Sequence, residues 1–200
     1  DVLLCSDANS IATIPQNATV GTSSLRRAVQ IRCTRPDITL VGYRGNLDRR
    51  ITRLESGIVD ATLLAAAGLD RLEMDLPYAT RLPIEEMLPA VSQGVIGLQC
   101  RTNDSLTHAL LSRVNHATTM SCITAERALL KALDGSCRTP IAGYAIIGDG
   151  IITLEGMLAN MEGTVLIRKT LSAPEADAIA LGRALAAELK GYFVDMVVAL

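Results

Sequence analysis

The sequence has few aromatic residues, with four tyrosines, one phenylalanine and no tryptophan among its 200 residues. Stacking of bases on aromatic side chains is therefore a poor candidate for a binding mode. Basic residues are not in excess either, because the formal net charge is -2. Nucleic-acid-binding proteins usually carry a basic surface, so we expect no nucleic-acid partner. The arginines of this chain must act locally.

Long apolar runs are also missing. No run approaches the ~18 residues that are needed to span a bilayer, and the first residues lack the basic flank and apolar core of a signal peptide. We therefore expect no membrane partner and a soluble protein of the cytoplasm. Because 49% of the residues are hydrophobic, the chain can bury a substantial core in one large domain or two small ones.

The five cysteines form no Cys-x-x-Cys pair and lie far from both histidines, so we expect no metal site. An odd count without a secretory signal indicates free thiols. Cys137 differs from the others, because it lies between Gly135 and Pro140 in a loop that we expect to be exposed, with Arg138 beside it. A neighbouring cation favours the thiolate. Cys137 could be a nucleophile or an attachment point; the alternative is an incidental loop cysteine.

Residues 21–27 read Gly-Thr-Ser-Ser-Leu-Arg-Arg and lie between a short β-type run and a helical pattern. Such a turn binds anions, because the first N–H groups of a helix have no partner within the helix and its dipole is positive there. Thr22, Ser23 and Ser24 add hydroxyl donors. Arg26 and Arg27 oppose the helix dipole, and a negatively charged ligand would explain them. The alternative is an ordinary N-cap followed by two solvent-facing arginines.

A second unit of the same kind follows. Residues 38–43 are predicted to form a strand that ends in Arg44-Gly45-Asn46, and a helix over 47–56 comes next. Two strand–turn–helix units that place arginine at the carboxyl end of a strand are typical of a parallel α/β sheet with an anionic ligand in its crevice. We assign Arg44 and Arg50 to that site. We expect Arg49 and Arg53 to belong to a solvated helix face.

The remaining pattern predicts two domains. We expect a strand at 2–5, a strand or a strand leading into a helix at 60–69, a strand at 95–100 and a helix at 105–114. After these we expect a helix at 124–133 with Thr124 as N-cap, a three-stranded antiparallel sheet from 142–147, 151–158 and 164–169, and a helix opened by Pro174. The fold class is therefore α/β, with a parallel or mixed sheet in a central domain, followed by a small α+β domain.

Taken together, several motifs resemble the porphobilinogen deaminase family, also called hydroxymethylbilane synthase. The order and spacing of these motifs agree over nearly all of the chain. The motifs are residues 21–27, Arg44-Gly45-Asn46 with Arg50, Ala67-Gly68-Leu69 with Arg71, Leu88-Pro89-Ala90 with Gln93-Gly94, and Gly135-Ser136-Cys137 with Pro140-Ile141.

The resemblance implies a transferase of tetrapyrrole biosynthesis. The family joins four porphobilinogen units with loss of ammonia, on a dipyrromethane cofactor that is attached to a cysteine through a thioether, and Cys137 matches that cysteine. Each pyrrole carries acetate and propionate, which explains a set of fixed, bidentate cations. By the match, cofactor and substrate carboxylates would be held by Arg26, Arg27, Arg44, Arg50 and Arg71, with hydroxyl or backbone donors from Thr22, Ser24 and Gly45.

The resemblance also implies that part of the family's fold is missing. An aspartate that stabilises positive charge on the pyrroles belongs to an N-terminal domain that is largely absent from this chain, so no catalytic residue is identified. We expect 1–94 to be the central domain, 95–112 to return to the N-terminal domain and 113–200 to carry the cofactor cysteine. We expect these residues alone to lack turnover. Family members are found in the cytoplasm and in plastids, and the family suggests a monomer.

Two other classes of function remain open. One is a non-catalytic anion-binding module of the two-domain binding-protein type, whose architecture the central domain resembles. Such a module would need the arginines but not Cys137. The other is a thiol-redox or structural role for the cysteines, which no resolving partner close in sequence supports.

Overall fold

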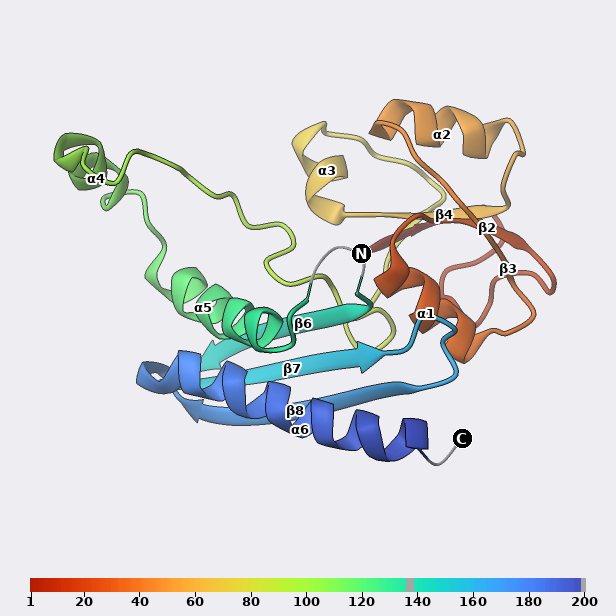
Figure 1. Ribbon diagram of the computed structural model, residues 1–200. Coiled ribbons are helices and arrows are strands. Elements are labelled where there is room, and N and C mark those ends of the chain that lie inside the picture. Colours follow the sequence, from red (N-terminus) through yellow and green to blue (C-terminus); the bar gives the residue numbers. More distant parts are fainter. Residues whose placement is uncertain (136–138, 199–200) are drawn as a thin grey trace.

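The computed structural model describes residues 1–135 and 139–198, with backbone alone over 195–198, and these residues form two units (Figure 1). The first unit contains a five-stranded sheet with the strand order β3-β2-β4-β1-β5, and the second contains a three-stranded sheet with the order β6-β7-β8. The predicted combination of a mixed-sheet α/β unit and an antiparallel α+β unit is confirmed. Among the described helices, none is long and apolar enough to cross a membrane.

The five-stranded sheet is mixed. β2 pairs in parallel with both β3 and β4, whereas β1 is antiparallel to β4 and β5. Because β2, β3 and β4 run in the same direction, their carboxyl ends meet at one edge. The elements of this unit are β1 (Val2–Leu4), β2 (Thr19–Gly21), α1 (Leu25–Thr34), β3 (Thr39–Val41), α2 (Leu47–Glu55), β4 (Ala61–Leu64), α3 (Ala66–Arg71) and β5 (Ala79–Arg81).

The core of this unit lies on both faces of the sheet. Leu3 and Leu63 belong to a cluster with Ile31 of α1, whereas Leu4 and Leu64 belong to a cluster with Ile51 of α2. Neighbouring residues of a strand point to opposite faces, so β1 and β4 are covered on both sides. This burial explains why their sequences are apolar without alternation.

The second unit packs two helices against one face of its sheet. The two helices cover residues from all three strands, with Leu129, Leu154 and Leu185 in one cluster. At the turn between β6 and β7, Asp149 has φ 50° and Gly150 has φ 75°, as the predicted hairpin requires. The elements are α5 (Ala117–Ala132), β6 (Ile141–Gly148), β7 (Ile151–Ala159), β8 (Leu166–Pro174), the short 3₁₀ helix η1 (Glu175–Asp177) and α6 (Ala178–Val198).

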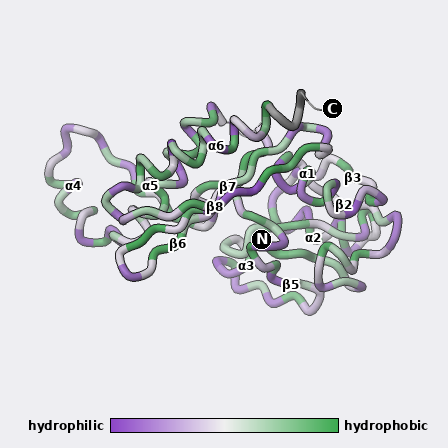
Figure 2. Tube along the Cα trace, turned by 90° about the horizontal axis from the view of Figure 1, so that it is seen from below, coloured by the Kyte–Doolittle hydropathy of each residue, from purple (hydrophilic) through white to green (hydrophobic). Residues whose placement is uncertain are grey.

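The two units share a buried apolar cluster. Val29 of α1 and Leu88 pack against Ala142, Met157 and Ala159 of the three-stranded sheet. Figure 2, which views the molecule from below, shows the units side by side with α1 facing β7 and β8. The face of the small sheet that α5 and α6 leave open is therefore partly covered by the first unit.

Residues 95–112 project away from both units, and α4 (Ser105–Leu111) lies at the far end of this segment in both views (Figures 1 and 2). The predicted strand over 95–100 is wrong, because this stretch is irregular and no described strand lies beside it. Its apolar side chains are exposed, with Ile96 at 76% and Leu106 of α4 at 73%. A strand forms only when its backbone groups find a partner strand.

Other boundaries also differ from the predictions. α5 begins at Ala117 with His116 as its N-cap, so the prediction of Thr124 as N-cap is wrong. The Thr124 hydroxyl instead donates to the carbonyl of Met120 one turn earlier, at 2.7 Å. β8 continues to Pro174, and α6 therefore begins only at Ala178. Burial of α5 against α6 extends the helix beyond its local cap signal.

Candidate anion-binding site

Three turns meet at the edge where the parallel strands end. Thr22–Ser24 follow β2, Arg44–Asn46 follow β3, and Ala65 follows β4. α2 and α3 begin side by side, since a Cβ added at Gly68 would lie 3.4 Å from the Leu47 side chain. The sheet therefore brings the two predicted arginine turns together, and adds a third turn.

The hydroxyl groups of the first turn fix its shape. Ser24 is the N-cap of α1, and its side chain accepts a hydrogen bond from the N–H of Arg27. Thr22 Oγ1 accepts from the Ser24 N–H at 3.2 Å, and Ser23 Oγ accepts from the Tyr43 N–H at 2.9 Å. Each hydroxyl still has its hydrogen to donate. The prediction that Thr22 and Ser24 donate to a ligand is compatible with this arrangement.

Arg26 and Arg27 are buried, so the alternative of two solvent-facing arginines is wrong. Their side chains are 6% and 10% exposed. Arg26 donates to the Leu88 carbonyl at 2.6 Å and to Gln93 Oε1 at 3.2 Å, and Arg27 donates to the Leu63 carbonyl at 2.9 Å. Burial, together with the charge of Arg27, lowers the pKa of Arg26 to about 9, and burial lowers that of Arg27 to about 10. Both remain charged at neutral pH. We call these two residues the arginine pair.

The anion next to the arginine pair is a residue of the chain itself. The carboxylate of Asp1 is fully buried, and its Oδ1 accepts from Arg27 Nη2 at 2.6 Å, Arg27 Nε at 3.2 Å and Gln93 Nε2 at 3.0 Å. Its Oδ2 lies 2.8 Å from Arg26 Nη1. Sequence reasoning missed Asp1, because nothing local marks a carboxylate whose partners lie 26 and 92 residues away.

The other arginines lie nearer the surface. Arg44 and Arg71 are exposed, and no described residue forms a hydrogen bond or ion pair with either side chain. Arg50 is half-buried and donates to the Gly45 carbonyl at 2.9 Å. Arg49 is exposed, as expected. Arg53 is half-buried, and its guanidinium group lies 4.6 Å from the centre of the Tyr43 ring.

A turn over residues 91–94 connects this site to the second unit. Gln93 bonds to Asp1 and Arg26, while the N–H of Ser92 donates to Glu126 of α5 at 2.6 Å. The other oxygen of Glu126 accepts from the Ala145 N–H of β6 at 2.9 Å. Burial raises the pKa of Glu126, and these two N–H groups lower it in part. The turn over residues 91–94 is therefore held by two buried carboxylates, Asp1 of the first unit and Glu126 of the second.

Ser92→Gly is expected to stabilise the protein by about 0.5–1 kcal/mol. Ser92 has φ 61°, and its Oγ is buried without a hydrogen-bond partner among the described residues. Glycine removes both the strain of the positive φ and the buried hydroxyl without a partner, although it makes the unfolded chain more flexible. Urea unfolding would measure the change. Ser56→Gly is the control, because Ser56 has φ -82° and its hydroxyl bonds to Arg53, so that variant should lose stability. A less stable Ser92→Gly variant would contradict the prediction.

Comparison with known proteins identifies the family. Residues 1–109 match the family model described as "Porphobilinogen deaminase, dipyromethane cofactor binding domain", and residues 120–191 match the one described as "Porphobilinogen deaminase, C-terminal domain". The chain belongs to the porphobilinogen deaminase family. A porphobilinogen deaminase from Syntrophotalea carbinolica is 40% identical over 199 residues, covering 100% of this chain and 63% of that relative. The chain thus spans less than two thirds of the length of this curated relative.

The family matches follow the two units. The first ends at residue 109, inside α4, and therefore contains the whole five-stranded sheet, the arginine pair and most of the projecting segment. The second contains all of the three-stranded sheet. Cys137, the predicted attachment point, lies outside the described residues. The flanking structure is described: α5 ends at Ala132, and β6 begins at Ile141.

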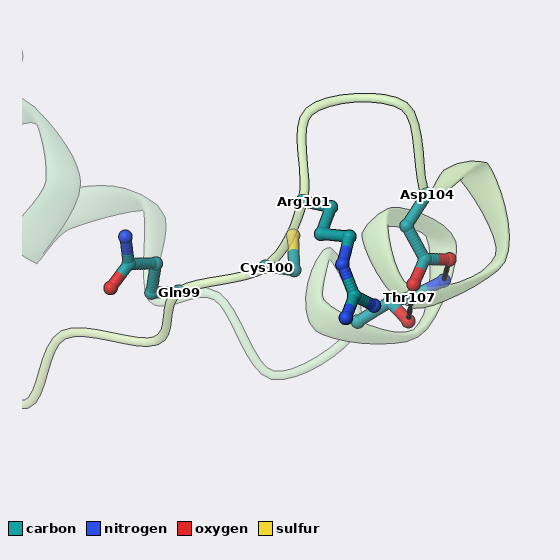
Figure 3. A pocket seen from close by; sticks show the side chains of 5 residues that line it. All are labelled: Gln99, Cys100, Arg101, Asp104 and Thr107. Carbon is teal, nitrogen blue, oxygen red and sulfur yellow. Dashed lines mark hydrogen bonds between the residues drawn. The ribbon is translucent and has the colours of Figure 1, made fainter.

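One hollow of the chain lies away from the arginines that were predicted to form the site. A hollow of about 540 Å³ on the projecting segment is lined by Gln99, Cys100, Arg101, Asp104 and Thr107. Figure 3 draws these five side chains. Asp104 caps α4 by accepting from the N–H and the hydroxyl of Thr107 at 3.0 and 2.7 Å. This cavity contains none of the predicted site residues.

Proposed function

We propose that this chain forms the cofactor-binding and C-terminal parts of a hydroxymethylbilane synthase. This transferase would join four porphobilinogen units, with release of ammonia, on a dipyrromethane primer bound to Cys137. The observation that carries the proposal is the group of arginines at the carboxyl edge of β2, β3 and β4, in a chain whose first 109 residues match the cofactor-binding family model.

The residues present fit an anionic cofactor. Arg44 and Arg71 are exposed cations without a described partner, and Arg50 is anchored by its hydrogen bond to the Gly45 carbonyl. Guanidinium groups bind carboxylates with two parallel hydrogen bonds, and the acetate and propionate of each pyrrole supply such groups. We assign Arg26, Arg27, Arg44, Arg50 and Arg71 to these carboxylates, with Thr22, Ser24 and the Gly45 backbone as further donors. The cofactor itself supplies the primer that is extended.

These residues would bind and orient the ligand, and they would not perform the whole reaction. Loss of ammonia leaves positive charge on the substrate, which a nearby carboxylate would stabilise. Asp1 is not available for this role, since its carboxylate is fully buried against the arginine pair. We expect that carboxylate in the part of the family's chain outside the match.

The projecting segment supports this division of roles. We propose that residues 1–94 form the central domain, that 95–112 lead to a further domain, and that 113–200 form the cofactor-carrying domain. Exposed apolar residues on 95–112 include Ile96, Leu98, Leu106 and Leu110, which are 56–76% exposed. Such a run of exposed apolar side chains is typical of a surface that another domain covers. We expect the complete enzyme to be a monomer in the cytoplasm.

The proposal predicts a covalent adduct. The protein purified from its natural source should show, by intact mass under denaturing conditions, the mass of the chain plus two linked pyrrole units. Cys137→Ser should remove the adduct completely, because serine does not form the thioether. Cys33→Ser is the matched control, since Cys33 is an exposed cysteine on α1, and it should keep the adduct. An unmodified natural protein would reject the function and favour an anion-binding module.

A further inference from the structure

The carboxylate of Asp1 binds both arginines of the pair, as a ligand carboxylate could. Arg27 donates to it through Nε and Nη2, which is the side of a guanidinium group that recognises carboxylates. With Asp1 in place, neither arginine of the pair has a side chain more than 10% exposed. A ligand carboxylate that binds the pair would therefore share these guanidinium groups with Asp1.

Asp1 is held unevenly by the two arginines. Its Oδ1 accepts three hydrogen bonds, from Arg27 and Gln93. Its Oδ2 is buried and accepts no well-directed hydrogen bond from any described residue, although it lies 2.8 Å from Arg26 Nη1. That nitrogen donates instead to the Leu88 carbonyl at 2.6 Å. The contact with Arg26 is therefore mainly Coulombic.

The arginine pair does not depend on Asp1 alone for its position. Arg27 also donates to the Leu63 carbonyl, and Arg26 donates to Leu88 and to Gln93 Oε1. These partners are neutral and remain when Asp1 changes. The two guanidinium groups would then stay in place, and the local charge would rise from about +1 to +2 because one carboxylate is neutralised.

We propose that Asp1 is an internal carboxylate that competes with ligand carboxylates for the arginine pair and so limits how tightly the site binds anions. The inference rests on the proposed function, in which the pair faces the carboxylates of a pyrrole chain. Asp1 would thus set the affinity of that site for carboxylate ligands. The growing pyrrole chain must finally leave the enzyme. Sites that bind its carboxylates with limited affinity release it more readily.

Titration of succinate tests this proposal in the full natural chain, with Cys137→Ser in every variant so that no covalent group fills the site. Asp1→Asn should lower the dissociation constant about tenfold at low salt, because a negative charge beside the arginine pair disappears. The gain should shrink at high salt, where charges are screened. Asp149→Asn is the control for net charge. It lies in the β6–β7 turn, far from the pair, and should change the constant less than twofold.

Two further variants keep the test decisive. Asp1→Ser also removes the charge and should tighten binding, so the test does not depend on the folding of one variant. Asp1→Glu keeps the charge and should leave the dissociation constant close to that of the parent. If Asp1 only stabilises the fold, folded Asp1→Asn and Asp1→Ser proteins bind succinate equally or more weakly, and the proposal is wrong. Tighter binding by a protein that never carries the pyrrole adduct would keep this inference and reject the proposed function.

Discussion

Arg27→Met lowers the free energy of unfolding by about 3 kcal/mol in our expectation, which is a large share of the stability of a domain of this size. The change removes two of the three hydrogen bonds to Asp1 Oδ1 and leaves the Leu63 carbonyl, which lies in the buried β4, without its donor. A buried acceptor or charge that loses its partner costs more than the bond contributed. Urea or thermal unfolding would measure the loss.

Two comparisons make this prediction specific. Arg49→Met removes an exposed guanidinium group that forms no hydrogen bond or ion pair with any described residue, and it should change stability by less than about 0.5 kcal/mol. In an Asp1→Asn background, Arg27→Met should cost at least about 1 kcal/mol less than in the parent, because its charged partner is already gone. Equal costs in both backgrounds would show that Asp1 and Arg27 do not interact energetically.

Gly182→Ala should destabilise the C-terminal unit by about 3 kcal/mol, whereas glycine-to-alanine changes inside a helix usually increase stability. Gly182 lies where α6 crosses α5. A Cβ at this position would overlap the Ala125 carbonyl oxygen and lie 2.7 Å from both the Leu129 nitrogen and the Ala128 Cβ. Because two of these atoms belong to the α5 backbone, the helices must move apart, and the core that they share with the sheet loosens.

Gly191→Ala on the same helix is the matched control. A Cβ at Gly191 meets nothing within 4 Å, so alanine should stabilise by about 0.5–1 kcal/mol through helix propensity alone. Thermal unfolding of the two variants should therefore shift in opposite directions. A Gly182→Ala protein as stable as the parent would mean that the α5–α6 contact is looser than the structure shows.

Features that depend on neighbouring residues are marked in the local sequence. Ser24 and Asn46 precede helices as caps, Gly57 ends α2 with φ 72°, and Gly148-Asp149-Gly150 joins β6 to β7. Each of these features is decided within four or five residues, by a side chain that bonds to the nearby backbone or by a glycine that permits positive φ. For the same reason the sequence predicted two arginine turns at the ends of parallel strands.

Features that depend on distant partners were predicted less well. The apolar stretch 95–100 has the composition of a strand, yet it is irregular where no described strand lies beside it. β5 was not predicted at all, because three residues that pair with β1 carry little local pattern. α5 begins about two turns before its predicted cap, since packing against α6 extends it.

The sequence by itself determined the class of fold, the two arginine turns and the resemblance that leads to the family. Only the tertiary structure decided that Arg26 and Arg27 are buried, that Asp1 and Gln93 hold them, and that Glu126 fixes the adjoining turn. The physical reason is the range of the forces involved. Caps, turns and periodicity act along the chain, whereas a buried charge is stable only beside partners that folding brings from elsewhere in the sequence.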